Sequence, residues 1–190
     1  MDLTKTAFLT LLACVGLERL MELRLSLRHQ RALALRGAQK RRDPQYAWMV
    51  ALHAGVLVGA ALEVILLHRP FIASLAFPAL LLFLLASLLR WWVIRTLGIH
   101  WNTEVVDSGS LGVITDGPFR WIRHPNYLGV FVELIALPLV HTAWITAAVA
   151  TAANVFVLRN RLRVEERLLE AVPAYRATMA GKPRFLPRIF

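Results

Sequence analysis

Residues 71–89 read FIASLAFPALLLFLLASLL and contain no charged side chain. A helix needs about 20 mainly apolar residues to cross a bilayer core of about 30 Å, so this stretch predicts a transmembrane helix. A second run of similar length, Ala47–Leu67, contains one carboxylate, Glu63. The shorter run Ala7–Leu17 could belong to a signal peptide, but no small-residue cleavage site follows it. We therefore expect a mature span over Leu3–Leu25.

The long apolar stretch Tyr127–Leu158 exceeds a single crossing, because at 1.5 Å per residue it would extend about 48 Å. Pro138 and His141 indicate a break near its middle. We expect two helices, Asn126–Val140 and Thr142–Val172, the second continuing into the cytoplasm as a charged amphipathic helix. The total is five transmembrane helices, which predicts an all-α, polytopic membrane protein.

Composition supports this fold class. The 190 residues are 57% hydrophobic, compared with about 45–50% apolar residues in soluble domains. This excludes disordered, collagenous and disulfide-stabilised chains. We expect a single integral-membrane domain over residues 1–190. Residues 1–100 would form three spans, and residues 101–190 a cofactor-binding loop, a helical hairpin and a C-terminal cytoplasmic segment.

The net charge of +10 arises from 22 Lys and Arg against 12 Asp and Glu. In a soluble protein this excess would indicate nucleic-acid binding. In a membrane protein, basic loops instead set the orientation and meet anionic lipid head groups, so no nucleic-acid partner is expected. The basic residues concentrate in 28–43, 90–123 and the tail from Arg159, against only Lys5 and Arg69 on the other side. Five spans put all three segments in the cytoplasm, with the N-terminus outside and the C-terminus inside.

Ionisable residues inside spans are costly and are therefore candidates for function. Glu18, Arg19 and Glu22 share one stretch and predict a structural polar cluster. For Glu133, a polar helix contact and a place in an acceptor site are both open. Glu63 is expected near the outer edge of the membrane, in contact with water.

The densest polar chemistry is the cytoplasmic stretch 101–127, WNTEVVDSGSLGVITDGPFRWIRHPNY. Its glycines and prolines predict a shaped loop rather than a continuous helix, and its interleaved aromatic and cationic side chains favour a binding loop. The alternative is an interfacial aromatic belt with snorkelling arginines. Downstream, Arg161 and Glu165 share one helix face. The scattered histidines predict no metal site, and GxGxxG, P-loop, CxxC and HExxH motifs are absent.

The pattern Gly-Pro-Phe-Arg-x-x-Arg-His-Pro-Asn-Tyr-Leu-Gly over residues 117–129 is followed by Arg161-x-x-x-Glu165-Glu166. Together with the closing Arg-Phe-Leu-Pro of residues 184–187, it resembles the isoprenylcysteine carboxyl methyltransferase family. Members are integral-membrane enzymes that use S-adenosylmethionine. The resemblance covers roughly Trp101–Phe190.

The resemblance implies a role for each matching residue. Arg161 matches an acceptor-binding arginine of the catalytic site, and Glu165 a carboxylate that binds the cofactor. S-Adenosylmethionine needs apolar walls for its adenine, a carboxylate for its ammonium and hydrogen-bond donors for its own carboxylate. The implied cofactor contacts are Glu104, Leu111, Gly112, Val113, Ile114, Phe119, His124, Pro125, Asn126, Tyr127 and Glu165.

The N-terminal half is similar to a bacterial branch of this family. The pattern Glu18-Arg19-x-x-Glu22-Leu23-x-x-Ser26-x-Arg28-His29 carries this likeness, as does Arg36-Gly37-Ala38. Members of that branch accompany type III polyketide synthases and are thought to O-methylate alkylpyrones. The expected acceptor is lipophilic, with either a prenylcysteine-type carboxylate or an alkylpyrone hydroxyl. Two other function classes are open: a membrane lipid reductase using a nicotinamide cofactor, and a non-catalytic small transporter. The oligomeric state is open.

Overall fold

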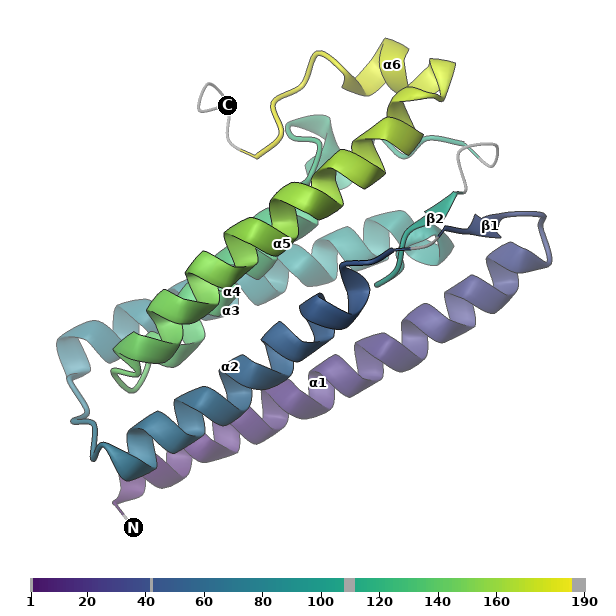
Figure 1. The fold of residues 1–190 in the computed structure, drawn as a ribbon. Helices are drawn as coiled ribbons and strands as arrows, with labels where there is room; N and C mark the ends of the chain where they lie inside the picture. Colours follow the sequence, from purple (N-terminus) through teal and green to yellow (C-terminus); the bar gives the residue numbers. More distant parts are fainter. Residues whose placement is uncertain (1, 42, 108–111, 186–190) are drawn as a thin grey trace.

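In the computed structural model, which describes residues 2–41, 43–107 and 112–185, five long helices lie side by side (Figure 1). The helices are α1 (Leu3–Ala34), α2 (Tyr46–Leu66), α3 (Ala73–Leu97), α4 (Pro125–Leu139), α5 (Trp144–Glu170) and the short α6 (Pro173–Met179). Two 3-10 turns, Gly98–His100 and Gly117–Arg120, lie in the segment between α3 and α4. The expectation of a mostly helical protein is confirmed.

The expected break in the second half of the chain is confirmed, because α4 ends at Leu139 and α5 begins at Trp144. Thr142 adopts a left-handed conformation (φ 54°) in this turn. Its hydroxyl donates to the carbonyl of Pro70 at 2.6 Å, which ties the turn to the connection between α2 and α3. Both connections therefore lie at the same end of the bundle.

By length and composition, two helical stretches could span a membrane, Tyr46–Leu66 and Ala73–His100. α4 is apolar but shorter, and α1 and α5 carry charges. On α3, Phe77, Leu81 and Leu88 are 66%, 58% and 66% exposed. Large apolar side chains thus face outward while charged ones are buried, an arrangement suited to lipid surroundings. Five membrane crossings stay a prediction.

Glu63 corrects one expectation, because it does not reach water: only 7% of the residue is exposed. Its carboxylate accepts hydrogen bonds from the backbone N–H groups of Ile145 (3.1 Å) and Thr146 (2.7 Å) at the start of α5. Arg69 forms an ion pair with it at 2.7 Å. The first backbone N–H groups of a helix lack intrahelical partners, and apolar surroundings offer them no hydrogen-bond acceptor. Glu63 supplies the acceptor for the start of α5.

A buried charge cluster joins α1, α3 and α4. Arg90 donates from Nη1 to Glu133 at 2.8 Å and from Nη2 to Glu22 at 2.7 Å. Arg19 lies 2.8 Å from Glu22, 3.3 Å from Glu18 and 3.4 Å from Glu133. The predicted polar cluster of the α1 charges is therefore observed, and Glu133 makes a polar helix contact.

Arg90 was not expected in this cluster, because the apolar run ends at Leu89 and the sequence suggested a loop beyond it. The helix instead continues to Leu97, and Gly98 ends it with a positive φ of 53°. Gly129 of α4 makes room for the arginine, since a Cβ there would lie 2.6 Å from Arg90 Cγ and 3.3 Å from the carbonyl oxygen of Ala86.

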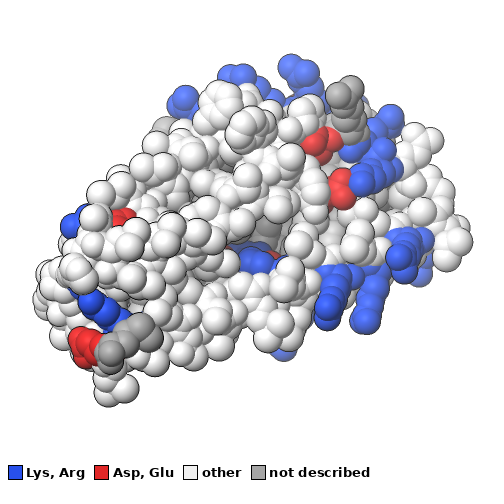
Figure 2. Space-filling model, turned by 60° about the horizontal axis from the view of Figure 1, so that its bottom comes forward, with Lys and Arg blue, Asp and Glu red and all other residues white. Residues whose placement is uncertain are grey.

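A small β-ladder is the one departure from an all-helical fold among the described residues. β1 (Gln39–Lys40) pairs antiparallel with β2 (Val106–Asp107). This ladder joins the α1–α2 connection to the loop after α3, so both lie at one end of the bundle (Figure 1). Basic side chains gather toward one end of the face seen in Figure 2, next to a largely uncharged region.

Candidate functional site

The loop between α3 and α4 is shaped by a glycine and anchored by an aromatic ring. Gly117 has a φ of +55°, and a Cβ there would lie 2.5 Å from Thr96 Oγ1, so this position favours glycine. The turn that follows buries Phe119 in a cluster with Trp101, Tyr175 and Met179. The loop is thereby packed between the end of α3 and α6.

The two adjacent glutamates of α5, Glu165 and Glu166, contact different parts of the protein, because successive helical residues point about 100° apart. Glu166 is buried against the loop: Arg184 donates to its two oxygens at 2.8 and 2.7 Å, and His124 Nε2 lies 3.2 Å from Oε1. The backbone N–H groups of Arg123 and His124 donate to the carbonyls of Pro183 and Arg184 at 2.9 Å each. Glu166 therefore clamps the loop and the C-terminal segment together.

These contacts predict an acid-sensitive clamp. The hydrogen bond with His124, followed by that with Arg184, lowers the pKa of Glu166 from 4.5 to about 2. Its stabilising contribution is thus complete above about pH 4.5 and is lost as the pH falls toward 2. In thermal unfolding at pH 6, we expect Glu166→Gln to be destabilised by about 1.5–3 kcal/mol. The difference from wild type should shrink below pH 4.5.

Glu170→Gln is the matched control, since Glu170 lies on the same helix, is half exposed and has one long contact, 3.6 Å to Arg123. We expect it to stay within about 0.5 kcal/mol of wild type. A stability difference for Glu166→Gln that persisted unchanged down to pH 2.5 would contradict the proposed clamp.

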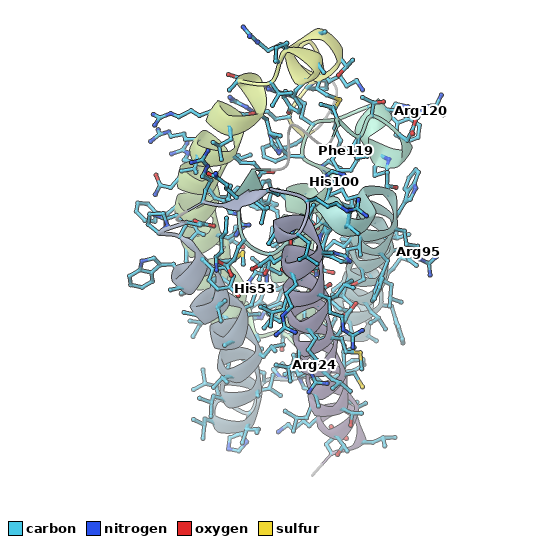
Figure 3. All side chains as sticks on the ribbon, turned by 90° about the vertical axis from the view of Figure 1, so that its right-hand side faces the viewer. Arg24, His53, Arg95, His100, Phe119 and Arg120 are labelled. Carbon is cyan, nitrogen blue, oxygen red and sulfur yellow. The ribbon has the colours of Figure 1, made fainter. Side chains whose placement is uncertain are left out.

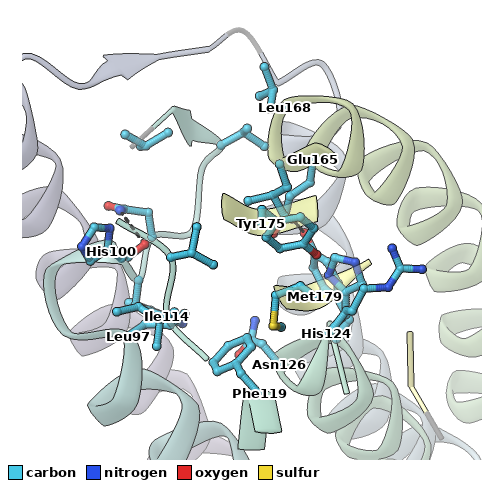
Figure 4. Close-up of a pocket in the computed structure, with 18 of the residues that line it drawn as sticks. Leu97, His100, Ile114, Phe119, His124, Asn126, Glu165, Leu168, Tyr175 and Met179 are labelled. Carbon is cyan, nitrogen blue, oxygen red and sulfur yellow. Dashed lines mark hydrogen bonds between the residues drawn. The ribbon is translucent and has the colours of Figure 1, made fainter. Parts of the chain in front are cut away.

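A cavity of about 190 Å³ lies between the loop, α5 and α6 (Figure 4). Leu97, His100 and Ile114 form one wall, facing Tyr175, His124 and Glu165. Leu111 lies outside the described residues. Every other candidate site residue predicted from the sequence lines this cavity: Glu104, Gly112, Val113, Ile114, Phe119, His124, Pro125, Asn126, Tyr127, Arg161 and Glu165. Their binding roles stay predictions.

The walls of this cavity offer both apolar and polar chemistry. Buried polar atoms without a hydrogen-bond partner among the described residues include Trp101 Nε1, Asn102 Oδ1 and Asn126 Oδ1. Glu165 accepts a short hydrogen bond from the hydroxyl of Tyr127, and Glu104 forms an ion pair with Lys40 at 2.6 Å. The apolar wall consists of Leu97, Val113, Ile114, Phe119, Leu168, Leu169, Val172 and Met179.

Arg161 is held from three elements. Its Nε donates to Tyr127 of α4 at 2.9 Å, and Nη2 donates to the carbonyl of Thr103 in the loop at 2.5 Å. Nη1 lies 2.8 Å from Met49 Sδ and 3.4 Å from Asp43 Oδ2, at the start of α2. The sequence did not suggest that Asp43 and Met49 are neighbours of Arg161. They lie more than a hundred positions from it, and residue spacing predicts contacts only within one element.

A second cavity of about 250 Å³ continues from the first into the bundle. Its walls come from all five long helices and the loop after α3, and they are mainly apolar, with Leu20, Leu57, Val130 and Val157 among them. Five residues line both cavities: Trp101, Asn102, Asn126, Tyr127 and Arg161. Arg161 therefore stands at the junction between a polar cavity at the bundle end and an apolar one inside it.

These features define a class of protein: a helical, membrane-type protein whose interhelical loop and last long helix enclose a ligand-sized site. The model of the isoprenylcysteine carboxyl methyltransferase family matches residues 79–171. This segment of the chain therefore matches the family that its motifs predicted. The matched segment contains the whole loop between α3 and α4, together with α4 and α5.

The fold resembles that of a solved eukaryotic intramembrane Ras methyltransferase, isoprenylcysteine carboxyl methyltransferase, with a TM-score of 0.60 and 23% identity. The match covers 78% of this chain and 54% of the solved one, so the chain spans about half the length of that protein. At this identity, the likeness concerns the fold alone.

Two curated bacterial proteins are similar along most of their length. YpbQ of Bacillus subtilis is 26% identical over 164 residues, which is 86% of this chain and 96% of YpbQ. A protein of Haemophilus influenzae is 28% identical over 156 residues, 81% of this chain and 90% of the relative. Both are described as uncharacterized proteins. The association with polyketide synthases stays a prediction.

Proposed function

We propose that this protein is an S-adenosylmethionine-dependent methyltransferase that acts on an acidic oxygen of a lipophilic acceptor. One observation carries the proposal: the predicted contact residues among the described positions surround one cavity, which meets an apolar cavity at Arg161. Such a pair of sites suits a polar methyl donor and an acceptor with an apolar tail. A single membrane-embedded domain over residues 1–190 is part of this proposal.

The residues fit the methyl donor. The apolar wall suits adenine, and the Glu165 carboxylate suits an ammonium group. Asn126 Oδ1 and Trp101 Nε1, which have no hydrogen-bond partner among the described residues, are available to the donor. When bound, S-adenosylmethionine supplies an already activated methyl group. The protein's own task is then to exclude water and to hold the acceptor oxygen in line with that methyl carbon.

Glu165→Gln tests the donor site. The substitution keeps the shape of the side chain and removes the charge proposed to meet the ammonium. Loss of a hydrogen bond to a charged group costs about 1.5–3 kcal/mol, or roughly 10- to 150-fold in affinity. We expect calorimetric titration of the detergent-purified variant with S-adenosylmethionine to show a Kd raised by that factor. Unchanged affinity in a folded variant would exclude Glu165 as a ligand.

The same titration separates the other two function classes. A membrane lipid reductase should bind a nicotinamide dinucleotide and show no competition by S-adenosylhomocysteine. A small transporter should bind neither. Glu170→Gln again serves as the control, because Glu170 is on the same helix and does not line the cavity.

The proposed acceptor site is the apolar cavity, with Arg161 presenting N–H groups to the acceptor oxygen. Three of its five N–H groups make hydrogen bonds within the described part of the protein, to Tyr127, Met49 and Thr103. Arg161 orients an anionic oxygen and does not act as a base, since guanidinium stays protonated. An alkylpyrone hydroxyl and a prenylcysteine-type carboxylate both present an acidic oxygen on an apolar tail.

We further propose five membrane crossings, with the N-terminus outside and the site in the cytoplasm. The support is that the basic α1–α2 connection and the loop after α3 are joined by the β1–β2 ladder at one end of the bundle. Reporters fused before Met1 and after Phe190 should report opposite sides of the membrane. A cytoplasmic signal from both ends would contradict the five-span topology.

A further inference from the structure

His53 of α2 is an ionisable side chain that the proposed donor site leaves unused. It lines the apolar cavity, together with Met49 one helical turn earlier and Arg161. Figure 3 shows it farther from α6 than His100 and Phe119. Met49 Sδ lies 2.8 Å from Arg161 Nη1, so the residue one helical turn before His53 contacts the arginine proposed to bind the reacting oxygen.

The hydrogen bonding of His53 defines which nitrogen carries the proton. Nδ1 lies 2.8 Å from the carbonyl oxygen of Met49. A carbonyl only accepts, so Nδ1 carries the hydrogen and the neutral ring has its lone pair on Nε2. No second partner of His53 is present among the described residues. His53 Nε2 is therefore available as a hydrogen-bond acceptor in this mainly apolar cavity.

The charged groups near His53 are of both signs. The neighbouring cluster contains three carboxylates, Glu18, Glu22 and Glu133, against the two guanidiniums of Arg19 and Arg90. It therefore carries one excess negative charge when every carboxylate is ionised.

The charged residues that share a cavity with His53 lie on several helices. Arg19 and Glu133 line a small cavity of about 20 Å³ together with His53, room enough for one bridging water. Arg19 and Glu22 of α1, Arg90 of α3 and Arg161 of α5 border the larger cavity that the imidazole also lines. With Arg161 included, three guanidiniums match the three carboxylates, so charges of both signs border the cavity of the imidazole.

We propose that His53 accepts the proton of a hydroxyl-bearing acceptor, and so makes the site one for hydroxyl methylation; this rests on the proposed methyltransferase function. The O–H bond breaks, its proton goes to Nε2, and the oxygen electron pair forms the O–CH₃ bond. The pair of the broken S–CH₃ bond stays on the sulfur of the donor. The imidazolium returns its proton to water after the product leaves.

The membrane explains the need for a proton acceptor. Hydrocarbon disfavours the ionised form of any group, so a hydroxyl acceptor that reaches the cavity from the bilayer arrives protonated. Its proton must then be removed inside the site, and Arg161 cannot remove it. A carboxylic acid is a stronger acid than a hydroxyl, so it ionises at the aqueous surface of the membrane before it binds Arg161 and needs no such step.

Two substitutions at one position test this role. His53→Gln retains polarity but cannot carry a proton, and His53→Phe retains the ring shape. The probes are a long-chain alkyl hydroxypyrone and an N-acetyl-S-prenylcysteine. General-base catalysis contributes about 100-fold or more, so we expect both variants to lose about 100-fold in kcat for the hydroxypyrone and less than threefold for the prenylcysteine. His68→Asn is the control, since His68 lies in the exposed α2–α3 connection, and asparagine tolerates its positive φ of 48°.

A pH profile and two binding measurements separate catalysis from packing. In wild type, kcat/KM for the hydroxypyrone should rise with pH as His53 becomes neutral, and His53→Gln should lack this rise. The variant should bind S-adenosylmethionine as wild type does. In the absence of the methyl donor, the Kd of the variant for the hydroxypyrone should stay within about tenfold of wild type. The reason is that the substitution weakens one hydrogen bond and leaves the cavity in place.

Equal losses on both probes, or an unchanged pH profile in His53→Gln, would overturn the role of His53 while leaving the proposed function intact. Wild-type protein that binds no S-adenosylmethionine would overturn the proposed function itself. The two failures are therefore distinguishable from one set of measurements.

Discussion

Replacing Arg161 by lysine is expected to lower kcat about 100-fold, while the Kd for S-adenosylmethionine changes less than threefold. Lysine keeps the positive charge but loses the planar fork that joins Tyr127, Thr103 and Met49. A misplacement of about 1 Å in the reacting geometry can cost about 100-fold in rate. Since Arg161 stands where the two cavities meet, we expect the acceptor to be misplaced and the donor to bind almost normally.

The measurement is a kinetic series on wild type and Arg161→Lys with acceptors of different tail length. For wild type, each CH₂ removed from the tail should raise KM, because burying one CH₂ is worth about 0.8 kcal/mol. Arg159→Lys is the control, because Arg159 is exposed and lies two residues earlier on α5. Normal turnover in Arg161→Lys would refute its role. Equal efficiency for a water-soluble acceptor without a tail would refute access from the membrane.

Replacing Arg90 by leucine is expected to lower the free energy of unfolding by about 3–5 kcal/mol, since it removes one partner from a buried ion-pair network. Arg90 is 4% exposed, and its loss leaves Arg19 as the one cation paired with Glu22 and Glu133 among the described residues. Thermal unfolding in detergent should show a clear fall in Tm. The cluster also borders the apolar cavity, so we expect acceptor KM to rise in the fraction that stays folded.

Arg95→Leu is the matched control, because Arg95 is exposed on the same helix about one turn later (Figure 3). It should change stability by no more than about 0.5 kcal/mol. The double variant Arg90→Leu with Glu133→Gln should recover part of the lost stability, since one uncompensated charge is removed. Equal Tm values for Arg90→Leu and Arg95→Leu would contradict a network that holds α1, α3 and α4 together.

Much of the fold could be predicted from local sequence, because hydrophobic run length and helix-breaking residues act within a few positions. The run at residues 71–89 and the break between Pro138 and His141 are examples, and both correspond to observed elements. Helix ends were less predictable. Hydropathy ends α3 at Leu89, whereas the backbone stays helical until Gly98 can adopt a positive φ.

The loop motif predicted which residues would gather, and the described ones do line one cavity. The different directions of Glu165 and Glu166 could be expected from helix geometry, but their partners could not. Tyr127 and Arg184 reach these neighbouring glutamates from sequence distances of 38 and 18 residues. Which glutamate meets the cavity depends on how α5 is rotated against α4 and the loop.

By itself, the sequence determined the helical class, the apolar runs, the shaped loop and the chemistry of its side chains. Only the tertiary structure decided that Arg90 is buried between two carboxylates, that Glu63 caps α5, and that Asp43 and Met49 flank Arg161. It also decided that His53 shares a cavity with Arg161. The physical reason is that burial and hydrogen-bond partners depend on how separate helices pack, which hydrophobic periodicity within one segment does not encode.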